Sequence, residues 1–181
     1  MGYYDSPGVV ETKQDQSTVT KADKAAEVII LAELEKHFPD IAVISEEAAS
    51  EGHLPEVGRK FFLVDPLDGT REFIKKNGEF TVNIALIEED KPIAGIVYAP
   101  AMKKAYYGEK GVGSWQILLD DVATRSIDRI EPISAKPMAE KELILVGSRS
   151  HGDPQQAKKK KNHNIDEQKL VGSSLKFCLI A

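Results

Sequence analysis

The chain has 181 residues, of which 41% are hydrophobic and 29% charged, a composition that is ordinary for a globular protein and excludes a disordered or fibrous one. The net charge of −5 argues against a general nucleic-acid-binding protein, because such proteins need a basic excess. The single cysteine, Cys178, excludes an intramolecular disulfide framework, and no apolar run reaches the roughly 18 residues of a transmembrane helix. The first residues also lack the apolar stretch of a secretory signal. We therefore predict a cytoplasmic protein, with peripheral attachment to the inner face of the membrane left open.

The first clear elements are a helix and a short strand. Residues 20–37 have a broad apolar face, Thr20 and Asp23 have the spacing of a capping box, and Pro39 ends the predicted helix. Residues 41–44 are uniformly apolar and predict a short buried strand.

The stretch FFLVDPLDGT, residues 61–70, predicts a second buried strand followed by a sharp turn. We expect Pro66 to stop the strand, because proline has no N–H for the ladder. Gly69 permits a reversal of the chain, and we expect Thr70 to cap a short helix over residues 71–75.

The second half of the chain reads mainly as strands. Residues 80–87 and 92–99 predict an antiparallel hairpin, and residues 143–146 another buried strand. Residues 105–107 are a further strand candidate, whereas 116–130 is ambiguous. Residues 175–181 predict the first turns of a buried helix that includes Phe177, Leu179 and Ile180. Both ends of the sequence are abrupt, and we expect an incomplete chain.

Acidic side chains follow both buried strands of the first half. Glu46 and Glu47 come after the first strand, and Asp65 and Asp68 come after the second. If these strands are neighbours, the carboxylates converge and repel one another unless they are protonated or bind cations. Bridging carboxylates that hold Mg²⁺ ions form a phosphoryl-transfer site. The plainer alternative is that the two aspartates only end a strand and form an ordinary Asp-Gly turn.

Such a site also suggests roles for the neighbouring residues. Glu47 is a candidate for holding and deprotonating an attacking water, with Thr70 as a hydrogen-bond relay. The N–H groups after Gly69 and Thr70 would face a bound phosphate.

Several motifs together resemble a known family. The segments SEEA, FLVDPLDGTREFIKKNGEFTVNIALIE and GIVYAP are similar to the lithium-sensitive, Mg²⁺-dependent phosphomonoesterase family that includes inositol monophosphatase. The segments GSRSH and GSSLKFC, with the run after DPLDGT, resemble its CysQ branch of 3′(2′),5′-bisphosphate nucleotidases. The resemblance implies a layered αβαβα fold, of which this chain holds an α+β part over 1–135 and the start of an α/β part over 136–181. It implies removal of the 3′-phosphate from adenosine 3′,5′-bisphosphate in sulfate assimilation. It also implies two or three Mg²⁺ ions per site, a nucleotide bisphosphate as the small-molecule partner, and leaves the oligomeric state open.

The resemblance assigns roles residue by residue. The metal ligands it implies are Glu46, Asp65, Asp68 and the backbone carbonyl of Leu67. The water-activating pair it implies is Glu47 and Thr70, with Gly69 and Thr70 as the phosphate-binding turn. Asp23 matches an acidic residue that orients the nucleophile through Thr70. The plainer explanation is the capping box, and the two roles do not exclude each other. Ser173 and Lys176, spaced as S-x-x-K at a helix start, suit the second phosphate of a nucleotide, and His151 is either a further contact or a surface loop residue.

Two departures from the family pattern shape the expectation for activity. The family's other metal aspartate lies in a W-D-x-A-A segment downstream of GSSLKFC, and its first helix lies ahead of Tyr3. We therefore expect weak binding of a second metal and poor activity from the chain as given. The alternatives are an inositol or sugar monophosphatase, against which the GSSLKFC segment argues, and an inactive fragment that binds Mg²⁺ or nucleotide.

Overall fold

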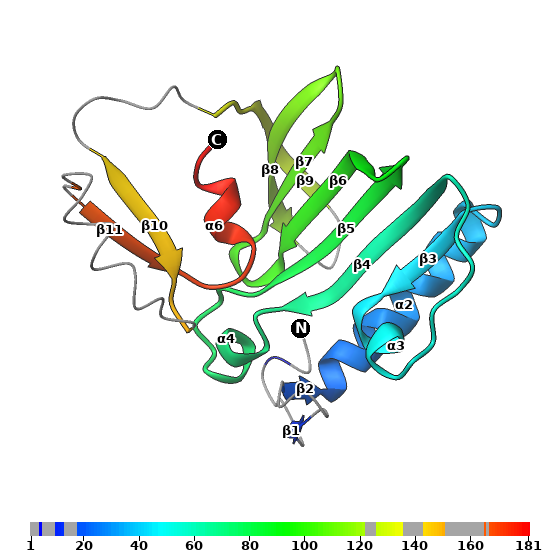
Figure 1. Cartoon of the computed structure of the whole chain (residues 1–181). Helices are drawn as coiled ribbons and strands as arrows, with labels where there is room; N and C mark the ends of the chain where they lie inside the picture. The colour runs from blue at the N-terminus through cyan, green and yellow to red at the C-terminus, as the bar shows by residue number, and fades with distance from the viewer. Residues whose placement is uncertain are drawn as a thin grey trace.

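The structure is a computed structural model that describes residues 4, 10–12, 18–121, 126–135, 143–150, 165 and 167–181. It places one large sheet, flanked by helices α2 and α3 at one edge, beside a small sheet and a C-terminal helix (Figure 1). The helices are α2 (Lys21–His37), α3 (Glu46–Ser50), α4 (Thr70–Ile74), the 3₁₀ helix η1 (Pro100–Met102) and α6 (Leu175–Cys178). The strands of the large sheet are β3 (Ala42–Ser45), β4 (Lys60–Asp68), β5 (Thr81–Glu88), β6 (Lys91–Ala99), β7 (Lys104–Glu109), β8 (Gly113–Asp121) and β9 (Ser126–Pro132). The remaining strands are β1 (Val10–Thr12), β2 (Thr18–Thr20), β10 (Ile144–Ser148) and β11 (Glu167–Val171).

The large sheet has seven strands in the order in which the chain supplies them. β3 and β4 are parallel, and every later pair is antiparallel. The predicted hairpin is confirmed as β5 and β6, joined at Glu89 and Asp90, which both have positive φ. The ambiguous stretch 116–130 falls largely in β8 and β9. The parallel pair matters for function, because it brings the ends of β3 and β4 to the same edge.

The second predicted strand, β4, is longer than the sequence predicts, and Leu63, which was expected to be buried in it, is 41% exposed. β4 continues through Pro66 to Asp68, so the expectation that Pro66 stops the strand is wrong. The register shifts between Asp65, opposite Asn83, and Asp68, opposite Thr81. Pro66 lies in this irregularity, where the ladder does not require its missing N–H.

The turn after β4 also differs in one detail. Gly69 has a φ of 92° and is the N-cap of α4, as a glycine in the left-handed region allows. Thr70 is the first helical residue and makes no capping hydrogen bond, so the expectation that Thr70 caps the helix is wrong. Its hydroxyl is instead directed at α2.

A small aromatic core lies beneath this turn. Phe73 and Phe80 pack edge to face with ring centroids 5.0 Å apart, and Tyr4 lies 5.4 and 5.1 Å from them. Leu67 and Ala22 complete the buried cluster, which joins β4, α4 and α2. Packed apolar side chains of this cluster therefore stabilise the turn that carries Asp68 and Gly69.

The predicted helix over residues 20–37 is confirmed as α2, although its apolar face is only partly covered. The capping box is present, with Thr20 at the N-cap and Asp23 at its third residue. Ile29, one of the apolar residues of this helix, is 65% exposed. None of the helices in the described part of the chain has the length and apolar character to cross a membrane.

The small sheet pairs β10 and β11 in parallel and leads into α6. The strand predicted at 143–146 and the helix start at Leu175 are confirmed. Phe177, Leu179 and Ile180 are exposed, at 67, 48 and 56%, so their predicted burial is wrong for this structure. The division of the chain at residue 135 stays a prediction.

Candidate active site

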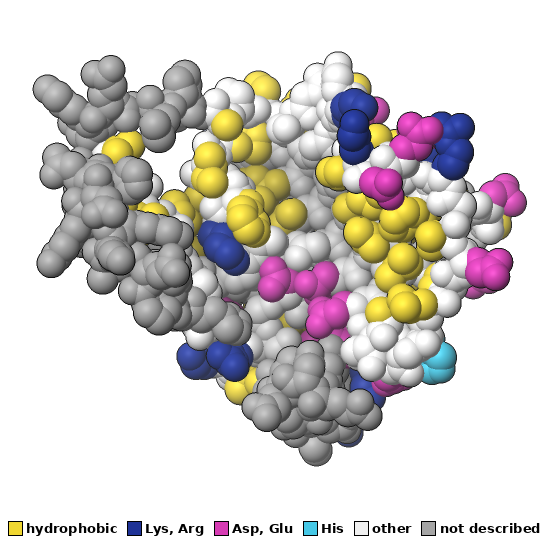
Figure 2. Space-filling view, viewed as in Figure 1, with side chains coloured by type: hydrophobic (Ala, Val, Ile, Leu, Met, Phe, Trp, Pro, Cys, Tyr) yellow, Lys and Arg dark blue, Asp and Glu magenta, His cyan; other side chains and the backbone are white. Residues whose placement is uncertain are grey.

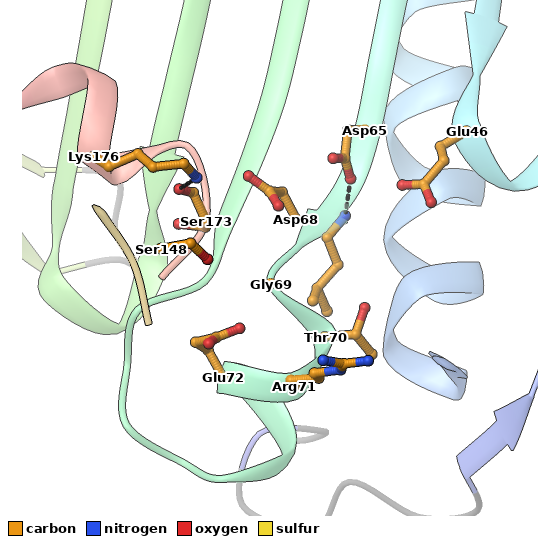
Figure 3. Close-up of a pocket in the computed structure, with 11 residues that line it drawn as sticks. Glu46, Asp65, Asp68, Gly69, Thr70, Arg71, Glu72, Ser148, Ser173 and Lys176 are labelled. Carbon is orange, nitrogen blue, oxygen red and sulfur yellow. Dashed lines mark hydrogen bonds between the residues drawn. The ribbon is translucent and has the colours of Figure 1, made fainter. Parts of the chain in front are cut away.

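A cavity of about 330 Å³ lies at the end of β4, where the large sheet meets the small one. It is lined by Glu46, Asp65, residues 67–72, Ser148, Ser173 and Lys176. Figure 3 shows the carboxylates of Glu46, Asp65 and Asp68 on the side formed by β4 and α3, with Ser148, Ser173 and Lys176 on the other side. Acidic side chains gather in the hollow at the centre of this face of the molecule (Figure 2).

Three of the four predicted carboxylates line this cavity because β3 and β4 are parallel neighbours. Glu46 is the first residue of α3, directly after β3, and Asp65 lies in β4. Burial raises the pKa of Asp65 to about 8, and the charges of Glu46 and Asp68 and a hydrogen bond with Glu46 add to the shift. Ionisation of Asp65 is thus unfavourable in this cluster, in agreement with the repulsion expected from the sequence.

Asp65 and Asp68 are each held by backbone N–H groups. The Leu67 N–H donates to Asp65 Oδ1 at 3.1 Å, the dashed bond beside Asp65 in Figure 3. The Ser174 N–H donates to Asp68 Oδ2 at 2.5 Å, and Asn83 Nδ2 lies 3.4 Å from the same oxygen. Asp68 therefore joins the acidic turn to the segment that precedes α6.

The donor set suits a hard divalent cation in kind and in charge. Carboxylate oxygens of Glu46, Asp65 and Asp68 are the ligands that Mg²⁺ prefers, and a cation would relieve the repulsion that raises the pKa of Asp65. In the described part of the chain, no three acidic, histidine or cysteine side chains already enclose a metal position. Asp68 already accepts a hydrogen bond from the Ser174 N–H. It can keep this bond and bind a cation as well, because a carboxylate has further lone pairs.

Asp23 performs the capping role and also contacts Thr70. Its Oδ2 accepts hydrogen bonds from the Thr20 N–H at 2.8 Å and the Thr20 hydroxyl at 2.6 Å. Its Oδ1 accepts from the Thr70 hydroxyl at 3.3 Å. Burial raises the pKa of Asp23, and these hydrogen bonds oppose the rise. The two explanations that the sequence left open are therefore compatible.

Of the remaining predicted site residues, Ser173 and Lys176 line the cavity and Glu47 does not. The Glu47 side chain is buried, at 4% exposure, and is not among the lining residues. Ser173 and Lys176 line the cavity, and the Lys176 ammonium donates to the Ser173 carbonyl. His151 lies outside the described residues.

Arg71, Glu72 and Ser148 also line the cavity, although we predicted no role for them. Ser148 ends β10, and the polar run directly after that strand was a usable signal for it. Arg71 and Glu72 follow the turn motif directly. Glu72 is 3% exposed and accepts a hydrogen bond from the Ser150 hydroxyl, which no local sequence pattern indicates.

Comparison with known proteins identifies the family of the chain. The chain matches the inositol monophosphatase family over residues 1–181 and belongs to that family. It is 43% identical over 183 residues to a protein of Salmonella typhimurium named 3′(2′),5′-bisphosphate nucleotidase CysQ, and 42% identical to the Escherichia coli K12 protein of that name. Each alignment covers all of this chain and 70% of the relative.

Two solved structures are similar in fold. A Thermotoga maritima IMPase has a TM-score of 0.76 at 24% identity, and the likeness covers 99% of this chain and 65% of that one. A CysQ from Bacteroides thetaiotaomicron, titled a bacterial member of the inositol monophosphatase family, has a TM-score of 0.65 at 35% identity. That likeness covers 88% of this chain and 62% of the solved one, so this chain spans a little under two thirds of both solved chains. The predicted family and the mixed α/β class are confirmed.

Proposed function

We propose that the protein is a Mg²⁺-dependent phosphomonoesterase that removes the 3′-phosphate of adenosine 3′,5′-bisphosphate, and of its 5′-sulfated form, to release phosphate. AMP is the other product from the bisphosphate. The relatives named CysQ are called 3′(2′),5′-bisphosphate nucleotidases, and they are similar to this chain along its whole length. The cytoplasmic location stays a prediction.

The observation that carries the proposal is the cavity with carboxylates on one wall and hydroxyl and ammonium groups on the other. Glu46, Asp65 and Asp68 would hold the cation, together with the Leu67 carbonyl. When bound, Mg²⁺ polarises phosphate oxygens and lowers the pKa of a coordinated water. Ser173 and Lys176 supply donors on the opposite wall, which suits a substrate with two separate phosphate groups.

The neighbouring residues would orient the water. The Thr70 hydroxyl donates to Asp23, so its oxygen lone pairs are directed to other donors, and a water in the cavity is such a donor. Asp23 is itself held by Thr20, which fixes the direction of the Thr70 hydroxyl. Glu47 does not line the cavity, so the proposal that it takes the proton from that water rests on its place in the SEEA segment alone.

Phosphate release tests the proposal. Purified protein is incubated with adenosine 3′,5′-bisphosphate, AMP or inositol 1-phosphate, with Mg²⁺ or with EDTA, and inorganic phosphate is measured. We expect release from the bisphosphate only, with Mg²⁺ present. Faster release from inositol 1-phosphate would support an inositol phosphatase, and release in EDTA would contradict a metal-dependent reaction.

A further inference from the structure

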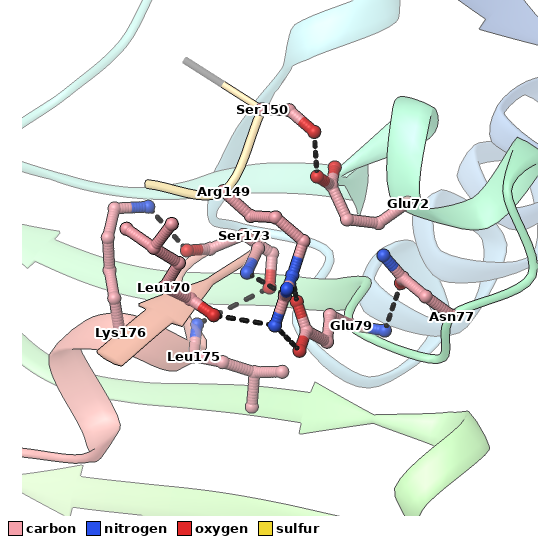
Figure 4. A network of polar contacts seen from close by, with 10 residues as sticks. Glu72, Asn77, Glu79, Arg149, Ser150, Leu170, Ser173, Leu175 and Lys176 are labelled. Carbon is pink, nitrogen blue, oxygen red and sulfur yellow. Dashed lines mark hydrogen bonds and ion pairs between the residues drawn. The ribbon is translucent and has the colours of Figure 1, made fainter. Parts of the chain in front are cut away.

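Glu79 and Arg149 form a polar network that ties the small sheet to the large one (Figure 4). The Arg149 guanidinium donates to both Glu79 carboxylate oxygens at 2.7 Å, Nε to Oε2 and Nη2 to Oε1. Arg149 follows β10, and Glu79 lies between α4 and β5. The Glu79 side chain is only 16% exposed, so this pair is shielded more than an ordinary surface ion pair.

Both members of the pair also hold the strand that leads into the cavity wall. Arg149 Nη2 donates to the Leu170 carbonyl at 2.6 Å, and the Gly172 N–H donates to Glu79 Oε2 at 2.8 Å. Arg149 holds the pKa of Glu79 below its usual value, and the Gly172 N–H acts in the same direction. The carboxylate is therefore an acceptor for a side chain and for a backbone group at once.

The backbones approach closely at the same place. A Cβ on Gly172 would lie 2.4 Å from Glu72 Cγ and 2.8 Å from the Glu79 carbonyl oxygen. A Cβ on Gly69 would lie 3.2 Å from that same carbonyl oxygen and 3.2 Å from Ser173 Cβ. The turn after β4 and the segment before α6 thus both pack against Glu72 and Glu79.

We propose that the Glu79–Arg149 pair is a clamp that positions the segment 172–176, and with it Ser173 and Lys176, against the acidic turn. Glu79 is a positioning residue, because its side chain is not among those that line the cavity. Within the same segment, Ser174 donates its N–H to Asp68 and its hydroxyl to Asn83 Oδ1 at 2.8 Å. The backbone of the segment is therefore held at Gly172 by Glu79 and at Ser174 by Asp68.

Amide hydrogen exchange with the Glu79→Ala variant tests the clamp without reference to activity. We expect the Gly172 and Ser174 amides to exchange at least tenfold faster than in the wild type, whereas the β5–β6 ladder is unchanged. Glu89→Ala is the matched control, because Glu89 forms an exposed pair with Arg59 at the far end of the hairpin. Faster exchange throughout both sheets, or no change at residues 172–174, would overturn the proposal.

Ligand affinity separates positioning from a purely structural role, and this arm rests on the proposed function. By calorimetry, we expect Glu79→Ala to weaken adenosine 3′,5′-bisphosphate binding about tenfold and to change the Kd for Mg²⁺ less than twofold. Arg149→Lys, which keeps the charge and loses the two-pronged contact, should give a smaller loss. Unchanged nucleotide affinity in Glu79→Ala would contradict the positioning role. If the wild type binds no nucleotide, the proposed function fails and the exchange result alone decides the clamp.

Discussion

Asp65 is the residue at which burial and repulsion compete most directly. Its carboxylate is close to Glu46 and Asp68, and burial with these charges raises its pKa to about 8. A raised pKa means that the folded state favours the protonated carboxyl. The stability linked to this group is therefore complete below the unfolded value near 3.8 and is lost as the pH rises toward 8. A bound cation would remove that loss.

The Asp65→Asn variant should therefore be more stable than the wild type when no metal is present. Asn keeps an oxygen for the Leu67 N–H and removes one of three like charges. We expect a melting temperature about 2–6 °C higher in EDTA at pH 8, and a smaller gain at pH 5. Mg²⁺ should raise the melting temperature of the wild type and leave the variant unchanged. Asp40→Asn, an exposed carboxyl at the opposite end of β3, is the control. Equal stabilisation of both proteins by Mg²⁺ would argue against Asp65 as a ligand.

Thr70 offers a second test on a single hydroxyl. Thr70→Val keeps the shape and loses the hydrogen bond to Asp23, while the capping box of α2 stays intact. We expect phosphate release to fall by roughly 10²-fold, as for loss of a group in proton transfer, with little change in melting temperature. Thr20→Val should lower the free energy of unfolding by about 1 kcal/mol, because it breaks the cap. It should lower phosphate release less than Thr70→Val does, because the Thr20 N–H still donates to Asp23. A fully active Thr70→Val variant would remove Thr70 from the mechanism.

At the scale of elements, the sequence predicted most of what local pattern determines. The capping box of α2, the short strand predicted at 41–44 and observed as β3, and the hairpin of β5 and β6 follow from residue types and their spacing. The extent of β4 did not, because the partner strand β5 accommodates Pro66 in a register shift. Nor could the sequence reveal that Glu72 and Glu79 support two glycine-containing turns, since that contact joins segments about 100 residues apart.

Gly172 tests this contact between elements. Gly172→Ala would place a methyl group 2.4 Å from Glu72 Cγ and 2.8 Å from a backbone oxygen, so the segment must move. We expect a loss of about 1–3 kcal/mol in the free energy of unfolding, measured by urea denaturation. Gly58→Ala is the control, because nothing lies within 4 Å of its added Cβ. A Gly172→Ala variant as stable as the control would mean that the two segments do not pack as described.

At the scale of the molecule, the site is shared between two sheets. The carboxylates come from the large sheet and its helices, whereas Ser148, Ser173 and Lys176 come from β10 and the segments around α6. Contacts across this boundary include two that involve a carboxylate, Arg149 with Glu79 and Ser174 with Asp68. The relative position of the two walls therefore depends in part on charge.

Acid should loosen this boundary before it melts the large sheet. Arg149 and the Gly172 N–H keep the pKa of Glu79 below its usual 4.5. A depressed pKa stabilises the fold above pH 4.5, and that contribution is lost as the pH falls through the folded value below 4.5. Amide exchange at pH 3, corrected for intrinsic rates, should show loss of protection at residues 172–175 with β5 and β6 still protected. Simultaneous loss in both regions would contradict a separable boundary.

The most direct test of the whole account is calorimetric titration of Mg²⁺ into the wild type and into Asp65→Asn, with and without adenosine 3′,5′-bisphosphate. If Glu46, Asp65 and Asp68 hold the cation beside the substrate phosphate, the wild type will bind Mg²⁺, the nucleotide will tighten that binding, and Asp65→Asn will show neither effect. Equal Mg²⁺ binding by both proteins, or no Mg²⁺ binding by the wild type even with nucleotide present, would contradict the account.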